Sequence, residues 1–248
     1  MAKIRGTAKS DFLNGSAQAD LVYGAAGDDI IFAAAGNDTV HGDDGNDFIL
    51  AGTGNDLVFG GNGNDNISGE AGNDTIHGDA GNDFILAGAG GDFVFAGNGN
   101  DNVFGEAGND TIHGDSGNDF INGGDGRDLL LGGAGNDIIH GGAGNDTFFG
   151  GVGYDRFYGG AGRDVFSHVA GDQVTEVFDF NAAEDRVSLF FGLQPGTTLV
   201  DIISTFQSVN ITEDRIELVV DANNTYIING DNIGTLDLAT ISSVVDIA

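Results

Sequence analysis

Aspartate recurs every nine residues along most of this chain. A nine-residue frame runs from Gly6 to Ser167 without an insertion or deletion, and the sixth place of all eighteen copies is Asp, from Asp11 to Asp164. Carboxylate oxygens are ligands that a hard cation such as Ca²⁺ prefers, at about 2.3 to 2.6 Å and six to eight per ion. Carboxylates held in phase over this length therefore indicate rows of divalent cation sites.

The charge balance supports the same interpretation. The chain carries a formal net charge of −31 at pH 7, and carboxylates stacked about 5 Å apart repel one another strongly. Two columns of nine turns have about sixteen gaps between turns, and one divalent ion in each gap would add about +32. The array is therefore close to neutral with metal and frustrated without it, and its charge excludes nucleic acid as a natural partner.

The rest of the frame predicts how the aspartates are positioned. It reads Gly, small or acidic, spacer, Gly, Asn, Asp, spacer, aliphatic, spacer. Glycine at the first and fourth places and asparagine at the fifth predict positive φ there, in a six-residue turn before a three-residue strand. One copy cannot bury its apolar side, so the copies must stack as a solenoid. Two copies form one coil, and nine coils give two thin parallel sheets back to back.

The predicted core is a ladder of aliphatic residues that becomes aromatic toward its end. It consists of the eighth-place residues Ile31, Val40, Ile49, Val58, Ile67, Ile76, Ile85, Val94, Val103, Ile112, Ile121, Leu130, Ile139, Phe148, Phe157 and Phe166. With 45 Gly and one Pro, disorder also has to be considered. Periodic glycines and in-phase aliphatics argue against it in the presence of calcium, although both states are expected at different calcium levels. The absence of Cys excludes disulfides and thiolate metal sites.

Copies such as Gly132–His140 (GGAGNDIIH) and Gly141–Phe149 (GGAGNDTFF) match the pattern GGxGxDxUx at every defined place. In this respect the chain resembles the RTX, or hemolysin-type calcium-binding, repeat proteins, and the resemblance covers about two thirds of its length. It implies an all-β fold, a parallel β-roll that is a right-handed β-solenoid of 18 residues per coil, with a non-repetitive, mainly β cap at the C-terminus. It also implies calcium between successive turns, each aspartate bridging two ions.

Carried over to this sequence, the resemblance implies up to about sixteen calcium ions in two columns. One column contains Asp29, Asp47, Asp65, Asp83, Asp101, Asp119, Asp137 and Asp155, and the other contains Asp38, Asp56, Asp74, Asp92, Asp110, Asp128, Asp146 and Asp164. Backbone carbonyls of turn residues would complete the sites, such as those of Gly36, Gly45, Gly54, Gly63, Gly72, Gly81, Gly90, Gly99, Gly108, Gly117, Gly126, Gly135, Gly144 and Gly153. The alternative is that the aspartates only form turns.

In several repeats another residue takes the place of the fifth-place asparagine, and we expect this to affect the strength of their calcium sites. Gly91, Arg127, Tyr154 and Arg163 replace the fifth-place asparagine. Because that place would supply mainly backbone, we expect the sites there to survive, weakened near the arginines. Magnesium is disfavoured because it dehydrates reluctantly and requires tighter octahedral geometry.

The chain divides into three predicted parts. Residues 1–23 are expected to be N-terminal capping repeats, because Lys9 and Gln18 replace the fourth-place glycine. Residues 24–167 form the calcium-binding roll, and residues 168–248 form a C-terminal cap that covers the open edge of the last coil. In the cap, strands are predicted at 172–181 and 184–189, a short helix around 199–206, and an antiparallel pair at 215–220 and 225–228. The stretch 177–189 (VFDFNAAEDRVSL) resembles a phrase that follows RTX arrays, and 243–248 resembles the ending of type I secretion substrates.

Two features of the outward places remain open. Apolar residues at the seventh and ninth places, such as Phe48, Phe84 and Phe93, either form an exposed stripe for self-association or a surface partner, or are covered by the tail or by flattening of the coil. Four histidines, His41, His77, His113 and His140, occupy ninth places. The first three are expected about 10 Å apart, too far for one zinc ion, and are interpreted as surface spacers.

The sequence therefore favours a secreted, extracellular protein that folds on binding calcium and acts as a structural or interaction protein at the cell surface or in the matrix. The N-terminus lacks the apolar core of a cleavable signal peptide, and no apolar run approaches the ~20 residues of a membrane span, so the type I secretion machinery is the expected export partner. No catalysis is expected, since HExxH and GxSxG motifs are absent. The alternatives are an accessory module of a secreted enzyme or toxin, for which five residues before the repeats leave little room, and a membrane-active protein.

Overall fold

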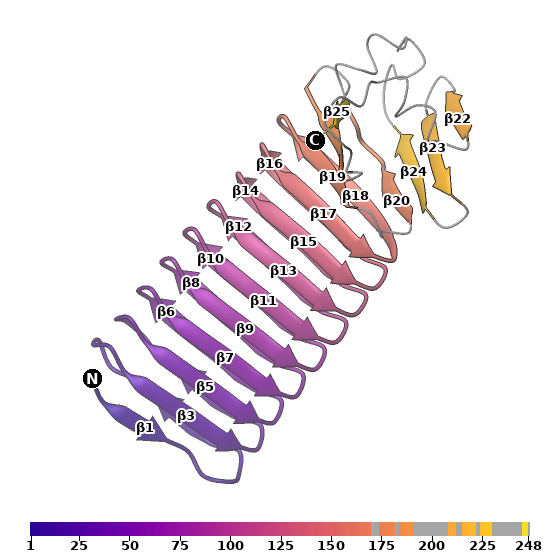
Figure 1. Ribbon diagram of the computed structural model, residues 1–248. Coiled ribbons are helices and arrows are strands. Elements are labelled where there is room, and N and C mark those ends of the chain that lie inside the picture. Colours follow the sequence, from indigo (N-terminus) through magenta and orange to yellow (C-terminus); the bar gives the residue numbers. More distant parts are fainter. Residues whose placement is uncertain are drawn as a thin grey trace.

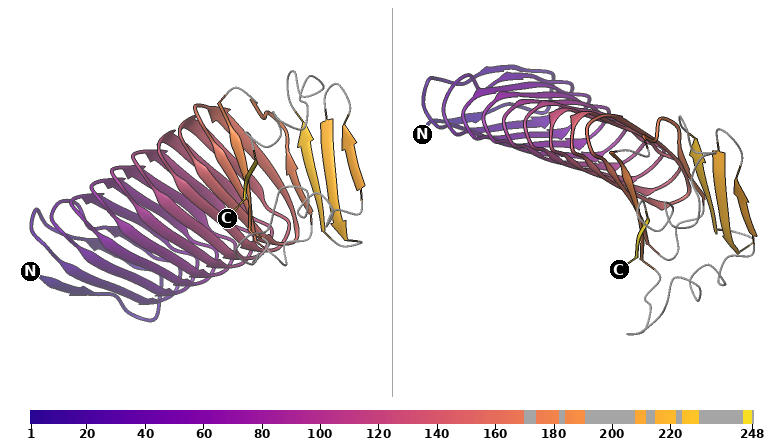
Figure 2. Two further views of the ribbon diagram at one scale, coloured as in Figure 1. Left: turned by 45° about the horizontal axis from the view of Figure 1, so that its top comes forward. Right: turned by 90° about the horizontal axis from the view of Figure 1, so that it is seen from above.

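The repeats wind into a flattened solenoid in which two sheets lie face to face (Figures 1 and 2). The computed structural model describes residues 1–169, 174–181, 184–190, 208–211, 215–221, 224–229 and 245–247. Within the repeats each strand pairs in parallel with the strand 18 residues further on, as Val58 does with Ile76. The predicted parallel β-roll with 18-residue coils is therefore confirmed. The predicted short helix around 199–206 lies outside the described residues.

The first sheet, called sheet A, has 12 strands among the described residues. In spatial order they are β1 (Lys3–Arg5), β3 (Leu21–Ala26), β5 (Thr39–Asp44), β7 (Leu57–Asn62), β9 (Thr75–Ala80), β11 (Phe93–Asn98), β13 (Thr111–Ser116), β15 (Leu129–Ala134), β17 (Thr147–Val152), β19 (Val165–Val169), β21 (Arg186–Phe190) and β25 (Val245–Ile247).

In the part of the chain that the structure describes, the second sheet, called sheet B, has 13 strands. In spatial order they are β2 (Phe12–Asn14), β4 (Ile30–Phe32), β6 (Phe48–Thr53), β8 (Asn66–Ala71), β10 (Phe84–Ala89), β12 (Asn102–Ala107), β14 (Phe120–Gly126), β16 (Ile138–Gly144), β18 (Tyr154–Ala161), β20 (Val174–Val177), β24 (Asn224–Asn229), β23 (Arg215–Asp221) and β22 (Ser208–Ile211).

The strands are longer, and the turns shorter, than the sequence predicts. A typical strand such as β8 has six residues and runs from the seventh place of one repeat through the third place of the next. Only the fourth, fifth and sixth places remain as turn. The difference arises because the backbone of the first three places also pairs with the neighbouring coils, as Gly61 does with Asp79.

Positive φ occurs at the fourth place of the repeat, as predicted. It also occurs at the second place, where the sequence does not predict it. Gly63 and Gly72, at the fourth place, have φ of 138° and 145°. At the second place Gly61 has φ of 113°, and Glu70, which is not glycine, has φ of 70°. The predictions of positive φ at the first-place glycines and at the fifth-place asparagines are wrong. The first place lies within a strand, and Ala33, Ala51, Ala87 and Ala96 are also accommodated there.

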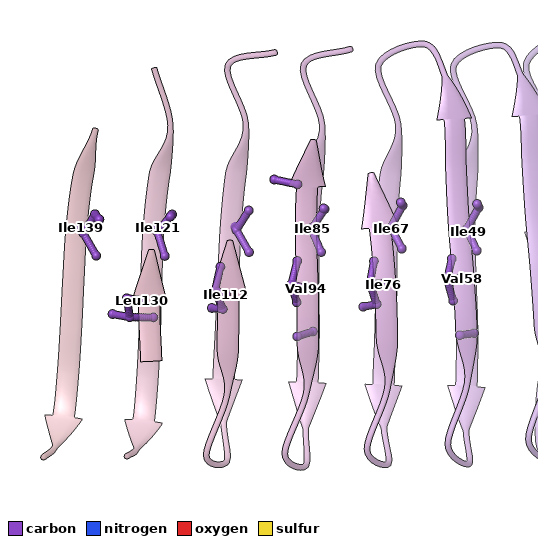
Figure 3. Close-up of a cluster of buried hydrophobic side chains, with 14 of the residues drawn as sticks. Ile49, Val58, Ile67, Ile76, Ile85, Val94, Ile112, Ile121, Leu130 and Ile139 are labelled. Atoms are coloured by element: carbon purple, nitrogen blue, oxygen red, sulfur yellow. The ribbon is translucent and has the colours of Figure 1, made fainter. Parts of the chain in front are cut away.

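The core between the two sheets consists mainly of eighth-place side chains (Figure 3), together with the first-place Ala33, Ala51, Ala87 and Ala96. Every one of these residues from Val22 to Phe157 has no exposed surface. Toward the C-terminus the aliphatic ladder becomes aromatic, and the rings of Phe148, Phe157 and Phe166 pack at centroid distances of 4.8 to 6.1 Å. Phe180, from beyond the repeats, extends this cluster against Phe166. The inward ladder predicted from the sequence is confirmed.

The chain beyond the repeats continues both sheets, so the last coil has paired edges. Strand β20 pairs in parallel with β18, and β21 pairs in parallel with β19. The predicted antiparallel pair is present as β23 and β24, and β24 joins sheet B by pairing with β20. Strand β25, from the terminal stretch that resembles a secretion signal, pairs with β21.

Candidate metal centre

The in-frame aspartates form two columns, one along each long edge of the roll. Each of them except Asp155, which lies within β18, ends a turn and directly precedes a strand. The backbone N–H of Asp47 donates to Oδ1 of Asp65 at 2.8 Å, and that of Asp65 donates to Oδ1 of Asp83 at 2.8 Å. The other column repeats the pattern with Asp56, whose N–H donates to Oδ1 of Asp74 at 2.8 Å. One carboxylate oxygen therefore links neighbouring coils, which is a structural role of the kind that the turn-forming alternative requires.

The second oxygen of these carboxylates has no such role. Oδ2 is buried without a hydrogen-bond partner in every in-frame aspartate from Asp29 to Asp146, and in Asp164. These aspartates are no more than 2 % exposed. Burying a charged oxygen without a compensating partner is costly, and native proteins rarely tolerate it. A whole row of such atoms indicates that a cation belongs beside them.

Burial also alters how readily these carboxyls ionise in the absence of metal. Desolvation raises the pKa of Asp74, Asp83, Asp110, Asp119 and Asp146 to about 7. It raises the pKa of Asp47, Asp56, Asp65, Asp137 and Asp164 to about 6, and in Asp47 the neighbouring carboxylates of the column add to the effect. The columns therefore resist carrying full negative charge unless positive charge is supplied.

Glycines of the turn leave the space that the aspartates occupy. A Cβ added to the first-place Gly78 would lie 2.6 Å from Oδ2 of Asp83. A Cβ added to the fourth-place Gly72 would overlap the carbonyl oxygen of Gly54, one coil earlier. The carbonyls predicted as ligands, those of the fourth-place glycines, therefore stack along the same turns as the aspartates.

The described residues contain no group of three or more His, Cys, Asp or Glu side chains placed to hold one metal ion. An ion in these turns would therefore depend on few carboxylates and on backbone carbonyls. That donor set consists only of oxygen, which suits calcium. The residues of the turns thus fit the cation that the sequence predicts.

The two N-terminal repeats satisfy their aspartates with protein hydrogen bonds. Oδ2 of Asp11 accepts from the N–H of Thr7 at 2.6 Å and from its hydroxyl at 2.8 Å. Oδ2 of Asp20 accepts from the N–H and hydroxyl of Ser16 at 2.7 and 2.8 Å. These bonds help to lower the pKa of both aspartates, to which the N–H of Ala2 contributes most at Asp20. The hydroxyls of Thr7 and Ser16 thus donate hydrogen bonds from the second place, where the later repeats have no hydroxyl.

The C-terminal end is closed in a similar way by residues outside the frame. Asp185 follows Asp164 after 21 residues instead of 18, and its Oδ1 accepts the N–H of Asp164 at 3.1 Å. Its Oδ2 accepts the N–H of Asn181 at 2.7 Å. Asp179 accepts the N–H groups of Gly159 and Gly160. The sequence prediction did not include Asp179 or Asp185, because they lie outside the nine-residue frame.

The fifth-place substitutions leave the turn backbone intact. The N–H of Arg127 donates to Oδ1 of Asn109 at 2.8 Å, as the N–H of Asn64 donates to Oδ1 of Asn46 at 2.7 Å in a regular repeat. Gly91, Tyr154 and Arg163 make the same bond. At this place the asparagine side chain also accepts a hydrogen bond, which the expectation of a mainly backbone contribution did not include. That the sites at the substituted places survive stays a prediction.

The ninth-place histidines have a role that the sequence interpretation missed. On sheet A they alternate with aromatic rings in one stack, in the order Tyr23, His41, Phe59, His77, Phe95 and His113. Centroids are 4.8 or 4.9 Å apart and the planes differ by 5° to 21°. His140 lies on the other sheet and stacks on Tyr158 at 4.4 Å. The missed signal was that an aromatic residue lies 18 residues before or after each of these histidines.

The apolar residues of the seventh place are partly open to solvent. Phe12 is 60 % exposed, Phe93 52 % and Phe84 38 %. Among the described residues these rings are therefore not covered by the tail. None of the described residues forms a helix of the length and apolarity that crossing a bilayer requires.

Comparison with known proteins defines the class. The profile described as RTX calcium-binding nonapeptide repeat (4 copies) matches residues 5–40, 23–58, 32–67, 41–76, 59–94, 95–130, 122–157 and 131–166. Together with the stacked aspartate turns, this establishes a calcium-binding β-roll. The chain belongs to the family of RTX calcium-binding nonapeptide repeat proteins. No curated protein matches it.

A solved structure supports the fold. A hyperactive, Ca²⁺-dependent, β-helical antifreeze protein from an Antarctic bacterium aligns at a TM-score of 0.55 and 20 % identity, over 82 % of this chain and 89 % of that one. The extracellular lipase LipA from Serratia marcescens aligns at 19 % identity over 93 % of this chain and 40 % of the lipase, with a TM-score of 0.24. The first shows that the coil architecture exists in a calcium-dependent protein.

Proposed function

We propose that this chain is a secreted protein whose roll forms when calcium binds to the in-frame aspartates from Asp29 to Asp164. The observation that carries the proposal is the row of buried Oδ2 atoms without hydrogen-bond partners. Calcium bound there supplies the positive charge that these oxygens lack. Because a preformed site does not exist in the unfolded chain, metal binding and folding form one equilibrium.

The ligands of each ion would come from two neighbouring coils. Successive aspartates of one column, such as Asp65 and Asp83, hold the ion from two coils, and turn carbonyls such as that of Gly63 complete its oxygen ligands. Up to about sixteen ions would fill both columns. Extracellular calcium modules have affinities of about 10⁻⁴ to 10⁻³ M, so the chain would remain unfolded in the cytosol and fold outside the cell. An unfolded chain suits export by the type I secretion machinery.

The role that we propose outside the cell is structural, at the cell surface or in the matrix, without catalysis. The support is the exposure of aromatic side chains such as Phe93 and Phe84 on the outer faces. Exposed apolar patches on a folded protein commonly mark interaction sites. Calcium-dependent retention on the surface of the producing cell would support this role, and a folded protein that is never retained there would contradict it.

The folding part of the proposal is tested with the purified chain. Circular dichroism is recorded during calcium titration and again after exhaustive dialysis against a chelator, and bound calcium is counted by calorimetry. We expect β-structure and compaction to appear with calcium and to disappear on chelation. A chain that is equally compact and equally heat-resistant without metal would refute the proposal, and magnesium serves as the ion control.

A second candidate is antifreeze activity through binding to ice, since the solved structure with the same coil architecture is an antifreeze protein. It is favoured here by an exposed column of asparagines at one coil spacing, which includes Asn64, Asn82 and Asn100. The measurement is thermal hysteresis of the calcium-loaded protein. Absence of hysteresis in a sample that circular dichroism shows to be folded would dismiss this candidate and leave the calcium proposal unaffected.

A further inference from the structure

The even-numbered strands from β2 to β16 form one layer along the rod, and its outward surface is here called face B (Figure 1). In each six-residue strand the seventh, ninth and second places point outward, as Asn66, Ser68 and Glu70 do in β8. The seventh and ninth places of face B include no Lys, Arg, Asp or Glu, although the chain has a net charge of −31. The acidic charge of the roll is thus kept away from the middle of this face.

Face B is also the more apolar of the two outward faces. Its exposed large apolar residues are Phe12, Ile30, Phe48 and Phe84. In the strands of sheet A that belong to the same coils, the exposed large apolar residues are Phe93 and Leu129. On face B the ring of Phe32 lies between those of Phe12 and Phe48, at centroid distances of 5.4 and 6.2 Å. A contiguous apolar surface of this kind commonly marks a contact site.

The seventh and second places of each strand of face B are matched to each other. Where the seventh place is large and apolar, the second is small, as with Phe84 and Gly88 in β10. Where the seventh place is asparagine, the second is glutamate, as with Asn66 and Glu70 in β8 and again in β12. Residues four apart in a strand are separated by about 13 Å, so the matched side chains do not meet within one chain. They meet if a second copy lies on the face with its strands reversed.

We propose that calcium-loaded copies of this chain pair face B to face B, about a two-fold axis that runs along the rod over the ninth-place residues. Both rods then point in the same direction, and each strand lies against the same strand of the second copy with its direction reversed. Seventh-place residues of one copy face second-place residues of the other. Phe84 faces Gly88 of the second copy, and Asn66 faces Glu70 of the second copy.

The charges of face B suit this arrangement. The amide of Asn66 can donate to the carboxylate of Glu70 in the second copy, and Asn102 can donate to Glu106 in the same way. The Glu70 side chains of the two copies lie at opposite borders of the contact, about 13 Å apart. On the axis, neutral ninth-place residues such as Ser68 face their own copies.

Other arrangements of the two faces lose this match. Antiparallel rods set second places against second places, so Glu70 meets Glu70 when β8 faces β8, and Glu106 when β10 faces β10. Like charges in contact oppose association. With β8 against β10, Asn66 meets the ring of Phe84. If parallel rods shift by one coil, Phe84 meets a glutamate.

The area of face B is sufficient for a dimer. The strands from β2 to β16 extend about 38 Å along the rod, and the span from the seventh to the second place is about 17 Å. The two copies together therefore bury about 1,300 Å², above the ~1,000 Å² expected of a specific contact. Both copies use the same surface, so the contact closes as a dimer.

This inference rests on the proposed function, because bound calcium offsets the net charge of −31 that otherwise keeps copies apart. It deepens that function by naming a second copy of the chain as the partner of face B.

The first test changes the charges that face each other. Asn66→Asp with Asn102→Asp sets carboxylates against Glu70 and Glu106 of the second copy, and we expect dimerisation at least about tenfold weaker. Adding Glu70→Lys with Glu106→Lys should restore the dimer, because the introduced carboxylates then face introduced ammonium groups.

The matched control adds the same charge elsewhere. It is Asn98→Asp with Ala134→Asp, at exposed third places on the edge between the sheets. Aspartate already occupies the third place at Asp44 and Asp125. This control should dimerise like the wild type.

The second test removes apolar surface from one face at a time. Phe48→Thr with Phe84→Thr should weaken the dimer, whereas Phe93→Thr with Leu129→Thr, which changes sheet A, should not. Threonine is chosen because it occupies the seventh place in alternate strands of sheet A. Sedimentation velocity over a range of concentrations measures all variants at about 5 mM CaCl₂, with circular dichroism on the same samples to confirm that each is folded.

The third test reads the direction of the rods. Ser68→Cys and Asn122→Cys are made separately in the chain, which has no other Cys. Each should give covalent dimers with a bismaleimide that spans about 10 Å, the separation of facing sheets. Ser116→Cys, at an exposed third place on an edge, is the control and should not. Antiparallel rods would cross-link at most one of the two ninth-place variants.

The proposal is overturned if the folded wild type is monomeric at every concentration or grows beyond a dimer. It is also overturned if Asn66→Asp with Asn102→Asp dimerises as tightly as the wild type, if the added lysines do not restore pairing, or if only one ninth-place variant cross-links. A folded monomer refutes only this inference and leaves the calcium proposal standing, whereas a chain that does not fold with calcium refutes both.

Discussion

At the scale of single residues, each in-frame aspartate divides its two oxygens between two tasks. In Asp83, Oδ1 accepts the N–H of Asp65, and Oδ2 is buried beside the first-place Gly78. The first oxygen holds coils together in any state of the roll. The second has no favourable interaction in the described protein, so its energy depends on the ion.

Replacement of one aspartate separates these tasks. Asp83→Asn retains an oxygen for the N–H of Asp65 but places an amide donor where Oδ2 stood, and a donor repels a cation. We expect about one or two fewer bound calcium ions per chain and a lower melting temperature in calcium. In chelator the variant should be no less compact than the wild type, because a buried charge is gone.

Calorimetric ion counts and melting curves measure this effect. The matched control is Asp125→Asn, which changes an exposed aspartate at a third place. If Asp83→Asn binds as much calcium as the control does, the in-frame aspartates are not the ligands.

Backbone conformation gives a second residue-scale prediction. Glu70 adopts φ of 70°, whereas Gly72 adopts φ of 145° directly against the carbonyl of Gly54. Glu70→Gly should raise the stability of the calcium-loaded roll by up to about 1 kcal/mol, because positive φ is costly for residues with a side chain. Gly72→Ala should lower it by about 2 kcal/mol or more, through strain and overlap. Chemical denaturation in calcium measures both, and equal effects of the two changes would contradict this explanation.

At the scale of elements, the ends of the array differ from its middle. The repeats of β2 and β3 satisfy Asp11 and Asp20 with Thr7 and Ser16, whereas the inner repeats leave Oδ2 without a donor. The terminal coil is therefore the part whose turns do not depend on metal for hydrogen bonding. This agrees with the expectation that solenoids need specialised end repeats.

Removing the donor hydroxyls tests this cap. In Thr7→Ala with Ser16→Ala, two hydroxyl hydrogen bonds to buried or half-buried carboxylates are lost. We expect faster amide hydrogen exchange in β1, β2 and β3 in calcium, with little change from β9 onward. Thr53→Ala, which changes an exposed threonine, is the control. Uniformly unchanged exchange would show that the hydroxyls do not stabilise the first coil.

At the scale of the whole molecule, the columns act together because their carboxyls share one environment. Without metal, the pKa values of inner aspartates such as Asp83 and Asp110 are about 7, above the ordinary value of 3.8. Between pH 3.8 and about pH 7 the metal-free folded state therefore binds more protons than the unfolded state. Its stability is greatest below pH 3.8 and falls as pH rises through about 7.

The metal-free chain should therefore be more compact at about pH 5 than at about pH 8. Calcium added to the compact metal-free chain at about pH 5 should release protons, because the metal displaces them from the same oxygens. Circular dichroism and sedimentation in chelator at the two pH values, and proton release during calcium titration at about pH 5, measure these effects. Calcium binding to the compact chain without proton release would mean that the buried carboxyls do not take part.

The nine-residue frame was sufficient to predict the coil, the columns and the core. Aspartate, glycine and an aliphatic residue in a fixed phase, such as Asp65, Gly63 and Ile67, permit one stacked arrangement, because a shift by one residue would turn the aliphatic side chain out of the core. The contacts between coils could not be predicted in this way, because residues 18 apart become neighbours there and no local pattern ranks their contacts. Only the tertiary structure showed that the second place carries positive φ, that Thr7 and Ser16 replace the missing partner, and that His77 stacks between Phe59 and Phe95.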